Sequence, residues 1–299
     1  MANKFLTIKE VARQALPRLI ENLVFPNLIY KDFSDTFQKK GDEIQIRKPA
    51  KLEAKEFDAS SGVSAQDIDD SQTVTVKLDK IATVDVEISA LEGALNIDDL
   101  NRQFIEPAAV ALAQKINSDG LELYKDIPYV CGTAGTTPDD LTDLAAVRKV
   151  LNANRVPTSG RCAVWDTEAD AAFTTIPSIV NAEKSGSTQA LREGSIGRLF
   201  GLDNYMSQAV KRHEAGSLSA AVKPKSETSA GATSITLSAT AVTGSLKKGD
   251  ILTIAGKTYV VTADAAAASN EITVNIYPAL QDTVTTSTAV AVAESHTAN

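Results

Sequence analysis

Residues 96–127, NIDDLNRQFIEPAAVALAQKINSDGLELYKDI, contain the long helical pattern from which the rest of the fold is worked out. Their apolar residues recur at the spacing that places side chains on one face of a helix: Leu100, Phe104, Ala108, Leu112, Ile116 and Leu123. Asn96 or Asp98 is suited to cap the start, and Pro128 stops the helix. At about 1.5 Å per residue the helix would be roughly 50 Å long, so we expect other elements to pack along it.

Pro107 lies inside this pattern and allows two interpretations. Because proline lacks a backbone N–H, it either kinks one long helix or occupies the first turn of a second helix that runs from Glu106 to Asp126. The helix-forming residues PAAVALAQKI favour the second interpretation.

The chain before this helix has the pattern of an arm. Residues 7–22 have helical apolar spacing, and Thr7 with Glu10 forms a capping box, but Pro17 and Pro26 interrupt the pattern. A marginal helix near a chain end gains order by packing on something else, and another subunit could supply that surface.

Two alternating stretches lie between the arm and the long helix. They are residues 43–48, EIQIRK, and residues 73–89, TVTVKLDKIATVDVEIS. The second keeps its apolar residues in one phase, which predicts a single strand roughly 55 Å long. Residues 50–72 between them are polar and have no core-forming pattern. We therefore expect a long two-stranded ribbon that only a neighbouring molecule could bury.

Downstream of the long helix the pattern is that of an α+β domain. Thr137 is expected to cap a helix with Asp139 and Asp140 in its first turn, followed by a strand at residues 161–165. From about Ser217 the chain becomes rich in short alternating strands, which predicts a β-barrel or sandwich of roughly 70 residues. The last residues, ESHTAN, are expected to be a polar tail.

Composition excludes several classes of function. The 299-residue chain has a net charge of −8, and its Lys and Arg residues are not concentrated, which argues against nucleic acid or anionic membrane as main partner. The N-terminal residues are too polar for a signal or membrane segment. Two cysteines are too few for a disulfide framework, so a reduced cytoplasmic setting is expected.

Residue types that bind metals or act as nucleophiles are few: His213, His296, Cys131 and Cys162. Without a supporting constellation we expect the two histidines to be exposed surface residues and the cysteines to be inert. The glycine pattern at residues 194, 197 and 201 lacks the strand and the lysine of a phosphate cradle. We therefore expect no enzyme activity, catalytic residue, cofactor or metal.

The order of these parts resembles the major capsid proteins of tailed phages, which have the Hong Kong 97-type fold. Residues 91–124 look like the spine region of that family, and residues 194–210, GSIGRLFGLDNYMSQAV, look like its axial-domain segment. Residues 247–264, KKGDILTIAGKTYVVTAD, and 272–280, ITVNIYPAL, are similar to the inserted β-barrel of gene-5 type coat proteins of short-tailed lambdoid phages.

The resemblance implies an α+β Hong Kong 97-type capsid fold with N-arm, extended β-loop, long spine helix, axial domain and an added small β-barrel. The corresponding boundaries are 1–36 for the arm, 37–90 for the β-loop and peripheral strands, 91–130 for the spine helix, 131–217 for the axial domain, 218–293 for the barrel and 294–299 for the tail. One departure stands out: in this family the chain returns after the barrel to complete the body, whereas here only AVAVAESHTAN remains. Either the chain is shortened or its barrel is a terminal appendage.

The function implied is self-assembly into an icosahedral head shell around double-stranded phage DNA, made in the host cytoplasm and located in the virion capsid. Implied partners are further copies in hexamers and pentamers, with scaffolding, portal and decoration proteins; the DNA is enclosed without sequence-specific binding, and no membrane is involved. Two alternatives remain. One is an encapsulin-like cellular compartment that packages protein. The other is a soluble enzyme or ligand-binding protein with a C-terminal β-module.

Charged ribbon residues are the expected contacts between subunits: Lys48, Lys51, Glu53, Lys55, Glu56 and Asp58. Exposed ion pairs contribute about 0–1 kcal/mol each, so their expected use is to set register, with a merely solvated loop as the alternative. Pro107 is the expected hinge at which the spine helix bends to fit different positions in a shell.

Overall fold

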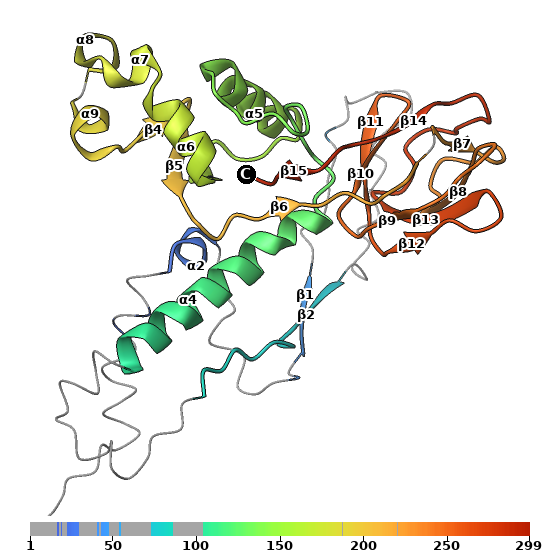
Figure 1. Cartoon of the computed structure of the whole chain (residues 1–299), viewed down its shortest axis with the longest axis horizontal. Helices are drawn as coiled ribbons and strands as arrows, with labels where there is room; N and C mark the ends of the chain where they lie inside the picture. The colour runs from blue at the N-terminus through green and yellow to red at the C-terminus, as the bar shows by residue number, and fades with distance from the viewer. Residues whose placement is uncertain are drawn as a thin grey trace, which may run out of the picture. The chain divides into compact units, whose positions relative to one another are not determined.

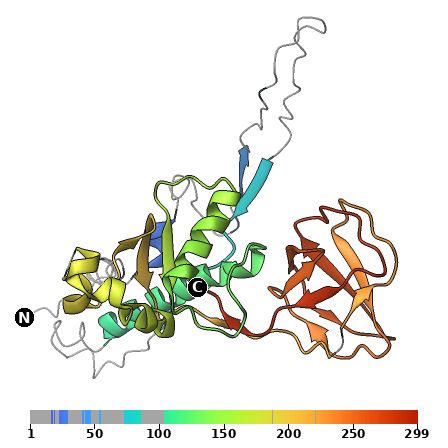
Figure 2. The same ribbon diagram turned by 90° about the horizontal axis from the view of Figure 1, so that it is seen from above.

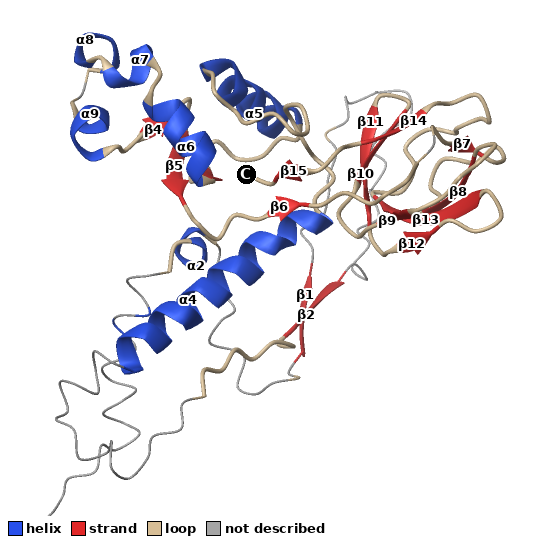
Figure 3. Cartoon of the chain, viewed as in Figure 1, coloured by secondary structure: helices blue, strands red, loops and turns tan. Residues whose placement is uncertain are grey.

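The computed structural model describes residues 17, 19, 23–29, 41, 43–47, 54, 73–85, 104–186, 188–219 and 221–299 (Figure 1). The chain divides into two compact units. The ribbon unit is Ile29–Ala94, and the main unit is Met1–Leu28 together with Leu95–Asn299. Both helices and strands occur, in agreement with the α+β prediction (Figure 3).

The ribbon unit contains an antiparallel ladder of two strands, β1 (Glu43–Arg47) and β2 (Thr73–Lys77), joined by five residue pairs. Both strands have the alternating, β-branched character that favours pairing. The ladder confirms that these two stretches pair with each other.

The prediction of one strand over residues 73–89 is wrong beyond Lys77, because residues 78–85 are not in a strand. The segment just before β1 explains where the ladder ends. The backbone N–H of Gly41 donates to the carbonyl of Leu78 at 2.8 Å, and Gly41 is in a turn with a φ of +96°. Such a φ suits glycine and takes the chain out of strand geometry. Residues 86–89 lie outside the described residues.

The long helix of the main unit is α4 (Glu106–Leu121), which the 3-10 helix η4 (Glu122–Asp126) continues. Pro107 lies in the first turn of α4, where its missing N–H costs no helical hydrogen bond. α4 begins at Glu106, as in the second interpretation, and residues 104 and 105 just before it are in a π-helical turn. Residues 96–103 of the predicted helix lie outside the described residues.

The buried residues of α4 follow one face of the helix: Ala109, Ala113 and Asn117. This face is centred one residue later than the predicted apolar stripe. Asn117 shows why, because its side-chain oxygen accepts hydrogen bonds from the backbone N–H groups of Val24 and Phe25, at 3.2 Å each. These groups lie at the start of α2 (Phe25–Leu28), so a polar contact ties the short helix to the long one.

The next part of the main unit surrounds a small mixed sheet. Its elements are α5 (Leu141–Ala153), β3 (Cys162–Trp165), α6 (Thr167–Thr174), α7 (Pro177–Val180), α8 (Ala182–Ser185), α9 (Gln189–Glu193), β4 (Arg198–Leu199) and β5 (Leu202–Met206). The strand order is β3-β5-β4, with β3 parallel and β4 antiparallel to β5. Leu144, Trp165 and Phe173 lie in its core, and the indole N–H of Trp165 donates to Asn204 at 2.9 Å.

The cap of α5 corrects one prediction. Asp140, rather than Thr137, is the N-cap, and its carboxylate accepts from the backbone N–H of Leu141 at 2.6 Å. Asp143, three residues after Asp140, completes a capping box with it. The helix therefore begins two residues later than Asp139.

The last part is a small β-barrel with a single core (Figure 2). Its strands are β7 (Lys223–Pro224), β8 (Ser234–Ser238), β10 (Ile251–Ile254), β11 (Lys257–Val261), β13 (Glu271–Tyr277) and β14 (Val290–Val292), beside a short pair of β9 (Ser245–Leu246) and β12 (Ala265–Ala266). The main sheet has the order β14-β10-β11-β13-β8-β7, and a bridge between Val222 and Val290 joins its two edges. The barrel is thus nearly closed, which leaves few unpaired edge groups.

The end of the chain returns from the barrel and pairs with the strand that leads into it. β15 (His296–Thr297) pairs antiparallel with β6 (Arg212–His213), and the side chain of Asn299 accepts from the backbone N–H of Asp166 at 2.7 Å. The residues expected to be a polar tail therefore form a strand. The barrel lies between two paired strands, so the description of it as a terminal appendage is wrong.

Candidate interaction surfaces

The ribbon unit exposes apolar side chains along one stretch of chain. The exposed residues include Val74, Val76, Leu78, Ile81 and Val84, and Ile81 is 63% exposed. Among the described residues, β1 and β2 pair only with each other. Among the described residues of the ribbon unit no second layer covers these side chains, so they form an exposed apolar surface. We call these five residues the ribbon surface.

An exposed ion pair lies at one end of the ladder. Lys77 Nζ lies 2.8 Å from Glu43 Oε1, and the two residues are opposite each other in the first pair. The hydrogen bond and the charge of Glu43 raise the pKa of Lys77, although both side chains are well exposed. A pair of this kind contributes little to stability but disfavours a shift of the strands by one residue.

The charged residues expected to contact other subunits lie outside the described residues: Lys48, Lys51, Glu53, Lys55, Glu56 and Asp58. Their role stays a prediction. The hinge role of Pro107 likewise stays a prediction, since its position in the first turn of α4 does not require a bend.

A second exposed apolar group lies at the end of the long helix. Leu123, Ile127, Tyr129 and Val130 are between 43% and 55% exposed. The prediction that Leu123 is buried is wrong, because η4 has about three residues per turn and rotates it away from the buried face of α4. We call these four residues the helix-end surface.

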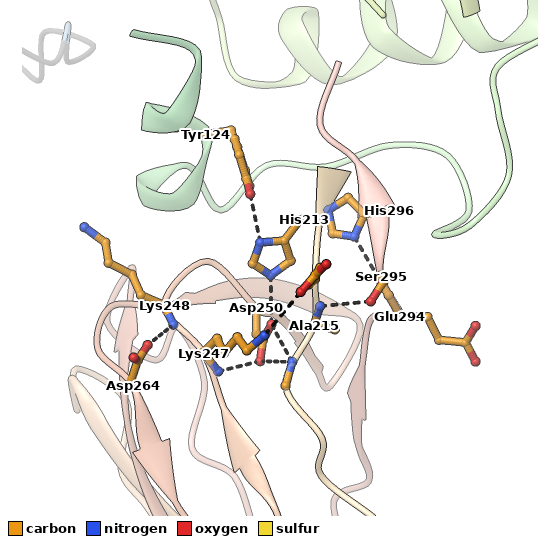
Figure 4. A network of polar contacts seen from close by, with 12 residues as sticks. Tyr124, His213, Ala215, Lys247, Lys248, Asp250, Asp264, Glu294, Ser295 and His296 are labelled. Atoms are coloured by element: carbon orange, nitrogen blue, oxygen red, sulfur yellow. Dashed lines mark hydrogen bonds and ion pairs between the residues drawn. The ribbon is translucent and has the colours of Figure 1, made fainter. Parts of the chain in front are cut away.

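Polar residues from three elements meet where the barrel joins the rest of the main unit (Figure 4). His213 Nε2 lies 2.8 Å from Asp250 Oδ1, and His213 Nδ1 lies 2.9 Å from the hydroxyl of Tyr124. The Asp250 carboxylate also accepts from the backbone N–H groups of Gly216 and Lys247. His213 is 3% exposed and Asp250 is fully buried, so the prediction of an exposed His213 is wrong.

The contacts determine which atom donates. A carboxylate only accepts, so His213 Nε2 carries a proton and donates to Asp250. In a neutral ring Nδ1 then accepts, and the hydroxyl of Tyr124 donates to it. Each polar atom of this Asp250–His213–Tyr124 chain has a partner, which is the condition for burying it at low cost. This arrangement links η4, β6 and the turn before β10 through buried hydrogen bonds.

The titration of Tyr124 provides a test of this geometry. Burial, with the charges of Glu122 and Asp250, raises the pKa of Tyr124 from 10.0 to about 12. The fold therefore favours the neutral phenol, and stability should be unaffected by this group below about pH 10 and should fall as the pH rises towards 12. Phenolate absorbance of the folded protein should show a late-titrating tyrosine that Tyr124→Phe removes. A Tyr124→Phe titration identical to the parent would contradict the burial of this hydroxyl.

The remaining histidine and the two cysteines do not form a common site. His296 is near His213, with ring centroids 5.3 Å apart, but its Nδ1 donates to the carbonyl of Glu294. Desolvation raises the pKa of both Cys131 and Cys162, which makes each a weaker nucleophile. Across the described ranges, no three His, Cys, Asp or Glu residues are grouped to hold a metal ion.

The three glycines of the predicted pattern lie in turns or at a helix end. Gly194 caps α9 with a φ of +66°, and Gly197 and Gly201 have φ values of +69° and +81° around β4.

An open cleft of about 470 Å³ lies beyond the ends of β3 and β5, lined by Asp166, Thr167, Glu168, Ser207, Gln208, Val210, Arg212 and Thr297. Asp166 is already used to cap α6 through the N–H of Ala169. Within the described part of the chain, every helix is too short or too polar to cross a bilayer.

No protein-family model and no curated protein matches the chain. Among solved structures, a chain from Mycobacterium phage Che8 is similar, with a TM-score of 0.51 and 17% sequence identity. The match covers 91% of this chain and 88% of that chain. At this level of identity the likeness concerns the fold, so the chain has a fold that also occurs in a phage protein.

Proposed function

We propose that the protein is a major capsid protein, whose copies assemble into the icosahedral head shell that encloses double-stranded phage DNA. The fold would be of the Hong Kong 97 type, with the barrel of the gene-5 type coat proteins. Two findings support the proposal. The fold resembles that of a phage protein over 91% of the chain, and the described order of ribbon, long helix, α+β part and barrel is the order that the resemblance implies.

The observation that carries the proposal is the ribbon surface. Its five apolar residues are exposed, Val74 and Val76 on β2 and the other three on the non-strand segment that follows it, and burying an apolar side chain of this size stabilises by about 1.5–3 kcal/mol. Covering them requires a surface that the described part of the ribbon does not provide. A neighbouring copy would provide it at every position of a symmetric shell, so modest contacts add up over many subunits.

The remaining features fit a structural protein. The chemical groups reported above form no catalytic set among the described residues, and the net charge of −8 suits a wall that does not adhere to DNA. Hexamers and pentamers of the chain would be the assembly units, with scaffolding, portal and decoration proteins as further partners. The site of action would be the virion, after assembly in the host cytoplasm.

The direct test is to express the full chain, separate it by size-exclusion chromatography and image the fractions by negative-stain electron microscopy. Closed shells or capsomers, alone or with scaffolding protein from the same phage, are expected. Particles that contain protein cargo and no nucleic acid after packaging would support an encapsulin-like compartment instead. A chain that stays monomeric under all of these conditions would contradict the proposal.

A further inference from the structure

The barrel is joined to the rest of the main unit by a thin connection. The chain leaves through β6 and returns through β15, and these strands share only two residue pairs. A two-stranded pairing of this length is marginal in water. The orientation of the barrel must therefore be set by other contacts.

Those contacts gather at the turn before β10, which lies against η4. Here Asp250 is linked through His213 to Tyr124, and Lys248 Nζ lies 2.8 Å from Asp126. Gly249, with a φ of +98°, packs so closely that a Cβ on it would lie 2.7 Å from Cγ of Lys125. The surface ion pair is half exposed and adds little, so the buried chain of three side chains is the main link.

We infer that the Asp250–His213–Tyr124 chain is a latch, which holds the barrel against the end of the long helix and whose release lets the barrel swing on β6 and β15 without unfolding. Both ring nitrogens of His213 are used, so the ring and its two partners satisfy one another in a single arrangement. The fifteen buried residues of the barrel core include none of the three. The barrel can therefore keep its own core when the latch opens. This inference does not depend on the proposed function.

Tyr124→Phe tests the latch from outside the barrel. It keeps the ring but removes the hydroxyl, which leaves His213 Nδ1 buried without a donor while the latch is closed. Opening exposes that nitrogen to water, so the open state gains relative to the closed one by roughly tenfold.

Hydrogen exchange followed by NMR reads this opening at named amides. The N–H groups of Ala215 and Gly216 donate to Ser295 and Asp250 at the connection, whereas that of Ile276 donates to Thr233 inside the barrel. In Tyr124→Phe the first two should exchange about tenfold faster, with Ile276 unchanged. Tyr129→Phe, which removes an exposed hydroxyl three residues beyond Asp126, is the matched control and should change neither.

Two results would overturn the inference. Unchanged exchange at Ala215 and Gly216 in Tyr124→Phe would mean that the hydroxyl does not hold the barrel in place. Equal acceleration at Ile276 would mean that the contact stabilises the barrel fold as a whole and that no separate opening exists.

Discussion

The double substitution Val76→Asp with Ile81→Asp is expected to leave the chain folded but unassembled. Both side chains are exposed in the single chain, so a carboxylate at either position remains hydrated before assembly. In a shell the same carboxylates would be buried against a neighbour without a partner, at a cost of several kcal/mol for each contact. Because every copy carries the change, assembly into large particles should be lost by size-exclusion chromatography and electron microscopy.

Thr75→Asp is the matched control for this variant. Thr75 lies between Val74 and Val76 in β2, is also exposed, and points to the opposite face of the ladder. It adds one carboxylate to the same strand as Val76→Asp does, and particles should still form. Normal particles from the double variant, or equal loss in the control, would show that the ribbon surface is not an assembly contact.

Asp250→Ala should lower the stability of the barrel. It leaves the buried imidazole of His213 without an acceptor, and it also removes the acceptor of the part-buried N–H groups of Gly216 and Lys247. Leaving the buried N–H of His213 without its acceptor costs about 1–3 kcal/mol, and the loss of the two backbone hydrogen bonds adds to this. Urea unfolding followed by far-UV circular dichroism should therefore begin at lower concentration than in the parent.

A comparison separates this local effect from general damage. Trp165 is the single tryptophan and lies in the core beside β5, so its fluorescence follows that part of the chain rather than the barrel. Its transition should move less than the circular dichroism transition. Asp264→Ala removes an exposed carboxylate that accepts from one backbone N–H, that of Lys248, and should cost no more than about 1 kcal/mol. An Asp250→Ala loss as small as that of Asp264→Ala would contradict the role given to the buried network.

Local patterns in the sequence were sufficient for much of the fold. The two alternating stretches predicted the β1–β2 ladder, and the helix-forming run after Pro107 predicted where α4 begins. Turn residues and alternation predicted a small β-barrel or sandwich after residue 217, and Trp165 has the buried position expected for it. These features depend on neighbours in sequence, through spacing, caps and turns.

The errors concern contacts between distant parts of the chain. The residues next to His213 in sequence do not indicate that it is buried, because its hydrogen-bond partners are 37 and 89 residues away. The return of β15 to β6 likewise depends on where the barrel places its last strand. Leu123 fits the helical stripe, and only the change to a tighter turn at Glu122 makes it exposed. A pattern of residue types within one segment carries no information about such long-range partners.

Of the two candidate surfaces, one could be predicted from the local sequence pattern and the other could not. Alternation predicted that the ribbon could not bury its own apolar residues, and the exposure of Val76 and Ile81 confirms this for the described stretch. The helix-end surface was missed because its residues continue an apolar run that looks like core. The residues of this surface face solvent because of the backbone geometry at and after η4, and the spacing of residue types does not specify that geometry.

The pairing of His213 with His296 has a consequence for how such a chain could change during evolution. The two ends of the barrel enter and leave as neighbours, so the 82 residues between them can be exchanged for another module without stretching the body. His213 limits this exchange, because it stays behind with one nitrogen facing the space the module fills. A successful replacement would have to bring its own acceptor for that nitrogen, so descendants of this architecture should keep a carboxylate at the module entrance even where the rest of the module differs.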